Sequence, residues 1–178
     1  MVTASPWCIP LAEGSRRARE AALFGTLGAM TFAAKIAMMG LPNIEPVSLM
    51  VMVFAVTLGK KALYPIIVYV LLEFMVFGIQ LWSINYLYVW PLLAWWAWRL
   101  RTMDSPLGWG ILSGTFGLLF GALCAPVYLL TGGPAAAVSW WISGIPFDLL
   151  HGAGNLVLAL VLFRPLRQLM ERSLERYR

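Results

Sequence analysis

The chain has 178 residues, of which 61% are hydrophobic and only 12% are charged, and its formal net charge is +5. This composition excludes an ordinary soluble domain and predicts an all-α integral membrane protein. Because one membrane-spanning helix takes about 20 residues, the length predicts a compact bundle of six transmembrane helices. We expect residues 19–168 to form this bundle, with tails at residues 1–18 and 169–178.

Six spans would place nearly all basic residues on one side of the membrane. That side receives Arg16, Arg17, Arg19, Lys60, Lys61, Arg99, Arg101, Arg164, Arg167, Arg172, Arg176 and Arg178. An excess of lysine and arginine marks cytoplasmic loops, so we expect both termini to be cytoplasmic. Basic residues at helix ends fix the orientation of the protein against the cytoplasm and against anionic lipid, which accounts for the net positive charge. Nucleic-acid binding is therefore not expected.

The first three predicted spans are separated by clear turn signals. The first covers residues 19–40, and two prolines in the turn at residues 41–46 end it, since proline cannot continue a helix. The second, residues 47–59, is short, so it is either tilted or only partly exposed to lipid. A lysine pair at residues 60–61 then returns the chain to the basic side, and the third span covers residues 62–81.

The fourth and fifth spans both contain proline. The fourth follows a turn at residues 82–85 and ends near residues 99–101, with Pro91 expected in its first turn, where proline is tolerated. The fifth covers residues 107–130, and Pro126 is expected to kink it.

Residues 131–144 carry no charge and are expected to form a loop on the non-cytoplasmic side. The sixth span begins near Pro146 and runs through Arg164 into a tail that we expect to continue as a surface helix. Cys8 and Cys124 lack metal-ligand spacing and an evident pairing geometry, so both are expected to be free thiols.

Seven polar side chains fall at or toward the side opposite the basic residues. Counting about 1.5 Å per residue from Lys61 places Glu73 about 18 Å into a span of about 30 Å, beyond the midplane. The seven are Lys35, Glu45, Glu73, Asn85, Asp148, His151 and Asn155. Ionisable groups in hydrocarbon rarely lack a use or a partner. The cluster therefore predicts a pocket that faces outward.

Structural roles are the alternative for each member of this cluster. Lys35 would snorkel to the headgroups or pair with Glu73, and Glu73 would then lock the bundle. Asp148 would cap the first turn of a helix. His151 and Asn155 share one helix face with Asp148 and would hydrogen-bond neighbouring helices.

Tryptophans lie near both predicted interfaces. Trp82, Trp90, Trp140 and Trp141 fall on the outer side, and Trp95, Trp96 and Trp98 on the basic side. Aromatic belts are normal at membrane interfaces, so anchoring is the ordinary role for each. An aromatic mouth above polar groups would also suit a flat heterocycle, which stacks on the rings while side chains satisfy its polar edges.

Small residues recur every four positions along the first span, at Ala21, Gly25, Ala29, Ala33 and Ala37. Such a smooth stripe lets another helix approach closely. It therefore predicts either a docking face for a partner or ordinary packing within the bundle.

Taken together, these features resemble the substrate-binding S components of energy-coupling factor (ECF) transporters. The resemblance rests on the six-span plan, the small-residue stripe, the turn LPNIEPVS at residues 41–48, the segment at residues 82–90, and GIPFDLLH at residues 144–151 with Asn155. It covers nearly the whole chain after about Arg16.

The resemblance implies a small subunit of the bacterial cytoplasmic membrane that captures a vitamin or related micronutrient outside the cell. It implies docking through Ala21, Gly25, Ala29 and Ala33 on a transmembrane coupling subunit, which two cytoplasmic ATPases drive. The substrate-binding candidates are Lys35, Asn43, Glu45, Glu73, Trp82, Asn85, Trp140, Trp141, Asp148, His151 and Asn155. No cofactor is expected.

Departures from the family pattern narrow the range of solutes that the protein is expected to transport. The chain carries no N-terminal metal-binding extension and no histidine-rich ligand set, so a metal ion is not the expected cargo. No G-x-x-x-x-G-K-[ST] sequence is present, so ATP hydrolysis would belong to the partners. The candidates include three acidic residues, Glu45, Glu73 and Asp148, but one lysine, Lys35. This excess of acidic side chains favours a ligand that donates hydrogen bonds or carries positive charge. Cobalamin, a deazapurine and other water-soluble cofactors or precursors stay open.

Two other classes compete with the transporter subunit. A noncatalytic membrane scaffold would share the topology and the docking stripe but would not need polar groups in the outer leaflet. An intramembrane enzyme would need a nucleophile with its base or a pair of metal ligands, and His151 has neither a partner histidine nor an H-E-x-x-H motif. We therefore do not expect an enzyme.

Overall fold

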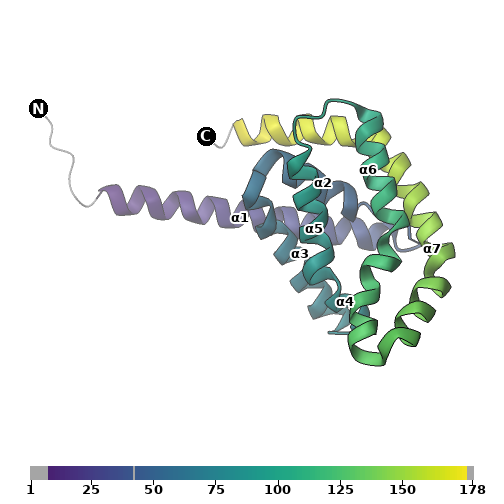
Figure 1. Cartoon of the computed structure of the whole chain (residues 1–178). Helices are drawn as coiled ribbons and strands as arrows, with labels where there is room; N and C mark the ends of the chain where they lie inside the picture. The colour runs from purple at the N-terminus through teal and green to yellow at the C-terminus, as the bar shows by residue number, and fades with distance from the viewer. Residues whose placement is uncertain (1–7, 42, 176–178) are drawn as a thin grey trace, which may run out of the picture.

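The computed structural model describes residues 8–41 and 43–175, and the side chains of residues 8–13 and 15 lie outside this description. Every regular element within it is helical (Figure 1). The elements are α1 (Cys8–Met38), α2 (Val47–Leu58), the 3-10 helix η1 (Gly59–Ala62), α3 (Leu63–Phe77), α4 (Leu81–Ile84), α5 (Tyr86–Arg99), α6 (Pro106–Leu118) and α7 (Phe120–Glu175). The predicted all-α class is confirmed for the described residues.

Three helical segments are long and apolar enough to cross a membrane: Arg16–Met38, Val47–Phe77 and Pro106–Glu175. The second and third are interrupted by Gly59 and Gly133, whose φ angles are 60° and 77°. A positive φ favours glycine, which lacks a Cβ, so both positions allow the chain to bend sharply. The protein is therefore embedded in a membrane, and the regular structure of its described residues is helical.

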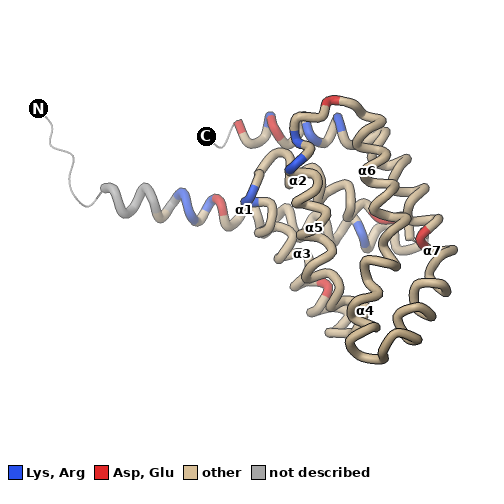
Figure 2. Tube along the Cα trace, viewed as in Figure 1, with Lys and Arg blue, Asp and Glu red and all other residues tan. Residues whose placement is uncertain are grey.

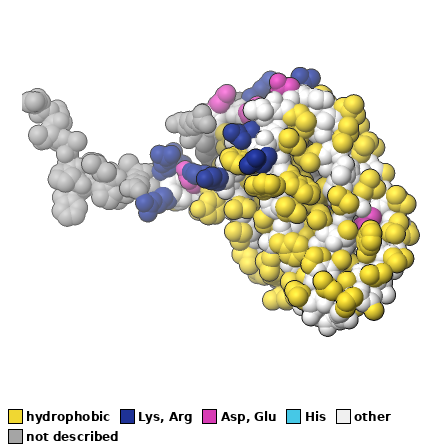
Figure 3. Space-filling view, in the orientation of Figure 1, with side chains coloured by type: hydrophobic (Ala, Val, Ile, Leu, Met, Phe, Trp, Pro, Cys, Tyr) yellow, Lys and Arg dark blue, Asp and Glu magenta, His cyan; other side chains and the backbone are white. Residues whose placement is uncertain are grey.

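Charge is distributed unevenly over the bundle. Lysine and arginine residues gather at the end where η1 and the C-terminal part of α7 lie, beside the projecting N-terminal half of α1 (Figure 2). Hydrophobic side chains cover most of the remaining surface in the same view (Figure 3). Arg176 and Arg178, which the sequence pattern also assigns to this end, lie outside the described residues. The resulting asymmetry gives the bundle a basic end and an opposite, charge-poor end.

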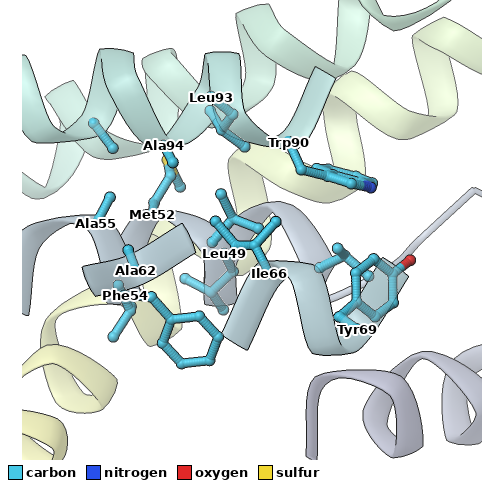
Figure 4. Packing of buried hydrophobic residues seen from close by; sticks show 14 of the residues in the cluster. Leu49, Met52, Phe54, Ala55, Ala62, Ile66, Tyr69, Trp90, Leu93 and Ala94 are labelled. Carbon is cyan, nitrogen blue, oxygen red and sulfur yellow. The ribbon is translucent and has the colours of Figure 1, made fainter. Parts of the chain in front are cut away.

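The short helix α2 forms the centre of the bundle. Eight of its twelve residues are buried, and it packs against α1, α3, α5 and α7. Leu49 and Met52 of α2 meet Ile66 of α3 and Leu93 of α5 in one apolar cluster (Figure 4). Other helices therefore cover most of α2, which agrees with the alternative that the short second span is only partly exposed to lipid. This core holds the ends of α1, α3 and α5 in fixed positions around it.

A seam of glycines brings α6 against α7. A Cβ added to Gly110 would lie 2.7 Å from Leu160, and one added to Gly117 would lie 2.7 Å from the backbone nitrogen of Gly152. Only glycine permits so close an approach of two helix backbones. Because the seam continues toward the charge-poor end, it carries residues 148–151 of α7 against the start of the same helix.

Several sequence predictions about local structure are wrong. Residues 131–144 are helical except at Gly133, rather than a loop. An apolar segment without water must satisfy its backbone hydrogen bonds internally, which favours helix over loop. Pro91 lies inside α5 rather than in its first turn.

Helix ends also differ from the predicted spans. The first helix already begins at Cys8, well before Arg19, and α3 ends at Phe77 rather than Leu81. Gly78, with a φ of 78°, terminates α3. The C-terminal extension expected after the sixth span is helical through Glu175.

Candidate functional site

A buried ion pair joins α1 to α3. The Lys35 Nζ lies 2.9 Å from each carboxylate oxygen of Glu73, and it lies 3.4 Å from the Tyr86 hydroxyl of α5. The two charged side chains are 8% and 0% exposed. Gly28 allows this contact, because a Cβ there would lie 2.6 Å from Val68 of α3. The pairing alternative for Lys35 is therefore the one observed.

Aromatic rings surround the Lys35 ammonium. It lies 5.3 Å from the ring centre of Tyr86, 5.6 Å from that of Trp82 and 5.7 Å from that of Phe77. The negative faces of aromatic rings attract cations at such distances. Carboxylate and rings together compensate the lysine charge inside the protein, so Lys35 is not free to attract an anionic ligand.

Glu45 lies beside this pair, in the turn between α1 and α2. Its side chain is partly buried, and burial raises the pKa of its carboxyl above the usual value, an effect that the positive charge of Lys35 reduces and the negative charge of Glu73 reinforces. The folded protein therefore binds a proton at Glu45 more tightly than the unfolded chain does.

Replacing Glu45 with glutamine is expected to raise the melting temperature slightly at neutral pH, because it removes the cost of burying a charged carboxylate. A raised pKa in the folded state means that this cost is fully present above that pKa and is lost as the pH falls through it toward 4.5, the ordinary value. Melting curves of both proteins against pH should therefore converge in acid. Curves that stay parallel over this range would contradict the assignment.

A cavity of about 420 Å³ lies between the two halves of α7 and the turn before α2. Its lining residues are Asn43, Phe120, Gly121, Cys124, Trp140, Ser143, Gly144, Phe147, Asp148 and His151. Four of these, Asn43, Trp140, Asp148 and His151, are candidates from the sequence. The volume is within the range of small-molecule sites.

Asp148 holds the start of α7 from within this cavity. Its two carboxylate oxygens accept hydrogen bonds from the Gly121 backbone N–H at 3.0 and 3.1 Å. A Cβ on Gly121 would lie 2.5 Å from one of these oxygens, so the contact requires glycine. The predicted cap of a helix that begins near Pro146 is wrong, because Asp148 lies in the interior of α7. Its carboxylate instead accepts from a backbone N–H at the beginning of α7. A carboxylate has lone pairs beyond those used here, so it can still accept from a ligand.

His151 and Trp140 bring polar atoms into the cavity wall. The His151 ring is 7% exposed and packs edge-on against Phe120, with ring centres 4.9 Å apart. Trp140 stacks on Tyr128 at 3.9 Å. Among the described residues, neither the His151 Nε2 nor the Trp140 Nε1 has a hydrogen-bond partner, although both atoms are buried. Buried polar atoms are normally hydrogen-bonded, but neither of these two is accessible from the cavity, so both stay unsatisfied within its wall.

Four remaining candidates make other contacts. Asn155 donates to the Ser48 hydroxyl at 3.0 Å and to the Ser113 carbonyl at 3.4 Å, which ties α7 to α2 and α6. Asn85 donates to two backbone carbonyls and accepts from Tyr88 at 2.7 Å. Trp82 contributes to the rings around Lys35, whereas Trp141 is 46% exposed and does not line the cavity.

Ring contacts connect the ion pair to the cavity. Tyr86 lies 5.3 Å from Trp90, Trp90 lies 5.7 Å from Phe120, and Phe120 packs on His151. The turn that carries Glu45 beside Lys35 also carries Asn43 into the cavity wall. Five of the seven residues in the predicted cluster thus lie in two neighbouring groups rather than in one pocket, whereas Asn85 and Asn155 bond elsewhere.

Sequence reasoning missed six lining residues: Phe120, Gly121, Cys124, Ser143, Gly144 and Phe147. A usable signal was present in the recurring glycines of residues 110–121, which predict a close helix approach at this position. Cys124 is a buried free thiol, as expected, and the side chain of Cys8 lies outside the described part of the chain.

The small-residue stripe of α1 faces away from the bundle. Ala21, Ala29 and Ala33 are exposed, and a Cβ on Gly25 would meet nothing within 4 Å. Gly28, by contrast, packs tightly against α3. The stripe is therefore not used for packing within the described bundle.

Comparison with protein-family models, with curated proteins and with solved structures finds no match for this chain. Within the described residues, no group of three or more histidine, cysteine, aspartate or glutamate side chains is placed to hold a metal ion. What the cavity binds is therefore inferred from its own geometry.

Proposed function

We propose that this chain is the S component of an ECF-type importer in a bacterial cytoplasmic membrane, which captures a vitamin or related micronutrient. One observation carries the proposal: a cavity of about 420 Å³ in the charge-poor half, whose lining includes the polar side chains of Asp148 and His151. Polar groups in a membrane interior are costly and tend to mark substrate sites. A scaffold would have no use for this arrangement.

In this proposal the membrane is crossed six times. The crossings are α1, α2, α3, α4 with α5, α6 with the first part of α7, and the rest of α7. Reversals at Gly59 and Gly133, both with positive φ, support separate crossings within the long apolar segments. The basic end would face the cytoplasm, which places the cavity in the outer half.

Coupling would take place on the exposed stripe of α1. Ala21, Gly25, Ala29 and Ala33 offer a smooth surface on which a helix of the transmembrane coupling subunit can dock. Two cytoplasmic ATPases would then supply the energy. Because Lys35 lies on the same helix and pairs with Glu73, the docking helix is firmly tied to the bundle.

Thermal stabilisation by a panel of water-soluble vitamins and nucleobase analogues tests this function. A ligand present at about 100 times its dissociation constant should stabilise the protein by about 2.7 kcal/mol. Gly144→Leu should remove most of this gain, since Gly144 lines the cavity and its Cβ position is open, so that the leucine can occupy part of the binding volume.

Gly25→Leu is the matched control for the panel, because Gly25 is also a helical glycine with open space around its Cβ position but lies outside the cavity. It should respond to the ligand as the wild type does. A panel that stabilises neither the wild type nor this control would favour the scaffold over the importer subunit.

A further inference from the structure

We propose that the cavity binds a flat heteroaromatic compound that carries a positive charge, either a fixed one or a protonated amino group. This inference rests on the proposed solute-binding role and names the class of solute. Two features of the cavity support it: the sign of its charge and the aromatic rings in its wall.

Charge in the cavity is negative and uncompensated by the described residues that line it. Asp148 is the charged member of that lining, and no lysine or arginine belongs to it. The lysine of the same half of the bundle, Lys35, is held 2.9 Å from Glu73. Electrostatic interactions are strong where water is scarce. A cation is therefore favoured over a neutral or anionic ligand.

Aromatic rings form much of the remaining wall, since Phe120, Trp140 and Phe147 all line the cavity. Such rings stack on flat heterocycles and attract cations. The fold already contains one ammonium held in this way, because Lys35 lies within 5.7 Å of three ring centres and is paired with a carboxylate. The cavity combines the same two elements, rings and a carboxylate, without a lysine.

A charge series on one ring tests the inference. Isothermal titration calorimetry of the full chain in lipid nanodiscs would compare 1-methylnicotinamide, a cation, with neutral nicotinamide and anionic nicotinate. We expect the cation to bind at least about tenfold more tightly than nicotinamide, and nicotinate to bind most weakly. Asp148→Asn should reduce this preference about tenfold, because asparagine carries no charge but keeps one oxygen for the Gly121 N–H.

Asp104→Asn is the matched control, since it removes an exposed carboxylate outside the cavity, and it should leave the whole series unchanged. Equal binding of the three compounds, tighter binding of nicotinate, or no binding of the cation at millimolar concentration would overturn the inference. If Asp148→Asn fails to fold, the wild-type series still decides. If a neutral or anionic vitamin stabilises the wild type but not Gly144→Leu, the inferred positive charge of the ligand is wrong while the solute-binding role stands. If neither the nicotinamide series nor the vitamin panel binds, the solute-binding role is wrong as well.

Discussion

Replacing Glu73 with glutamine is expected to destabilise the protein by about 3–5 kcal/mol, the cost typical of removing one partner from a buried ion pair. The Lys35 ammonium would remain buried, with the Tyr86 hydroxyl at 3.4 Å and three rings as its surroundings. Those contacts cannot replace a carboxylate with both oxygens at 2.9 Å. Thermal unfolding of the purified protein in detergent would measure the loss.

Two further variants make this result specific. The double variant Lys35→Met/Glu73→Leu removes both charges and should recover most of the lost stability, because a buried ion pair contributes little beyond an apolar pair of similar size. Lys61→Met, which removes an exposed ion pair with Glu20 at the basic end, should change stability little. A Glu73→Gln protein as stable as the wild type would show that Lys35 and Glu73 do not pair in the membrane.

Gly25→Leu is expected to abolish nutrient uptake in cells while leaving ligand binding to the purified subunit intact. Leucine at this exposed position would hold a docking helix away from α1, and nothing within 4 Å of its Cβ would be disturbed inside the bundle. Uptake of labelled nutrient and calorimetric binding, measured on the same variant, would separate coupling from capture.

Ala153→Leu is the control for added bulk, since Ala153 is exposed on α7 and lies outside the stripe. It should support uptake at the wild-type rate. Gly144→Leu should show the opposite pattern to Gly25→Leu, because it reduces binding itself and therefore uptake as well. If Gly25→Leu transports normally, docking does not use this stripe.

The ion pair was largely foreseeable from sequence. Charged residues are costly in hydrocarbon, and a count from the lysines at residues 60–61 places Glu73 at the depth of Lys35. Pairing with Glu73 was one of the two structural roles predicted for Lys35, and the observed distance between the two side chains confirms it. The rings of Phe77 and Tyr86 around the lysine were not foreseen, because ring placement depends on how α3 and α5 pack on α1.

The cavity was only partly foreseeable. Depth and helical spacing correctly predicted that Asp148 and His151 lie together. The same spacing also included Asn155, whose side-chain amide instead donates hydrogen bonds to Ser48 and Ser113. What separates them is the approach of α6 to α7 through the glycine seam, a tertiary contact that periodicity does not report. The helical path of residues 131–144 was missed for a related reason, since absence of charge indicates a side of the membrane and not a backbone conformation.

Native mass spectrometry of the protein purified from cells grown in rich medium tests solute capture most directly, with Gly144→Leu prepared in parallel. A tightly held nutrient survives extraction and is identified by its mass. We predict a reproducible adduct of vitamin size on the wild type and on Gly25→Leu, and its loss from Gly144→Leu. An adduct that Gly144→Leu retains in full would show that the solute binds elsewhere, and a wild type that never carries one would contradict capture in this cavity.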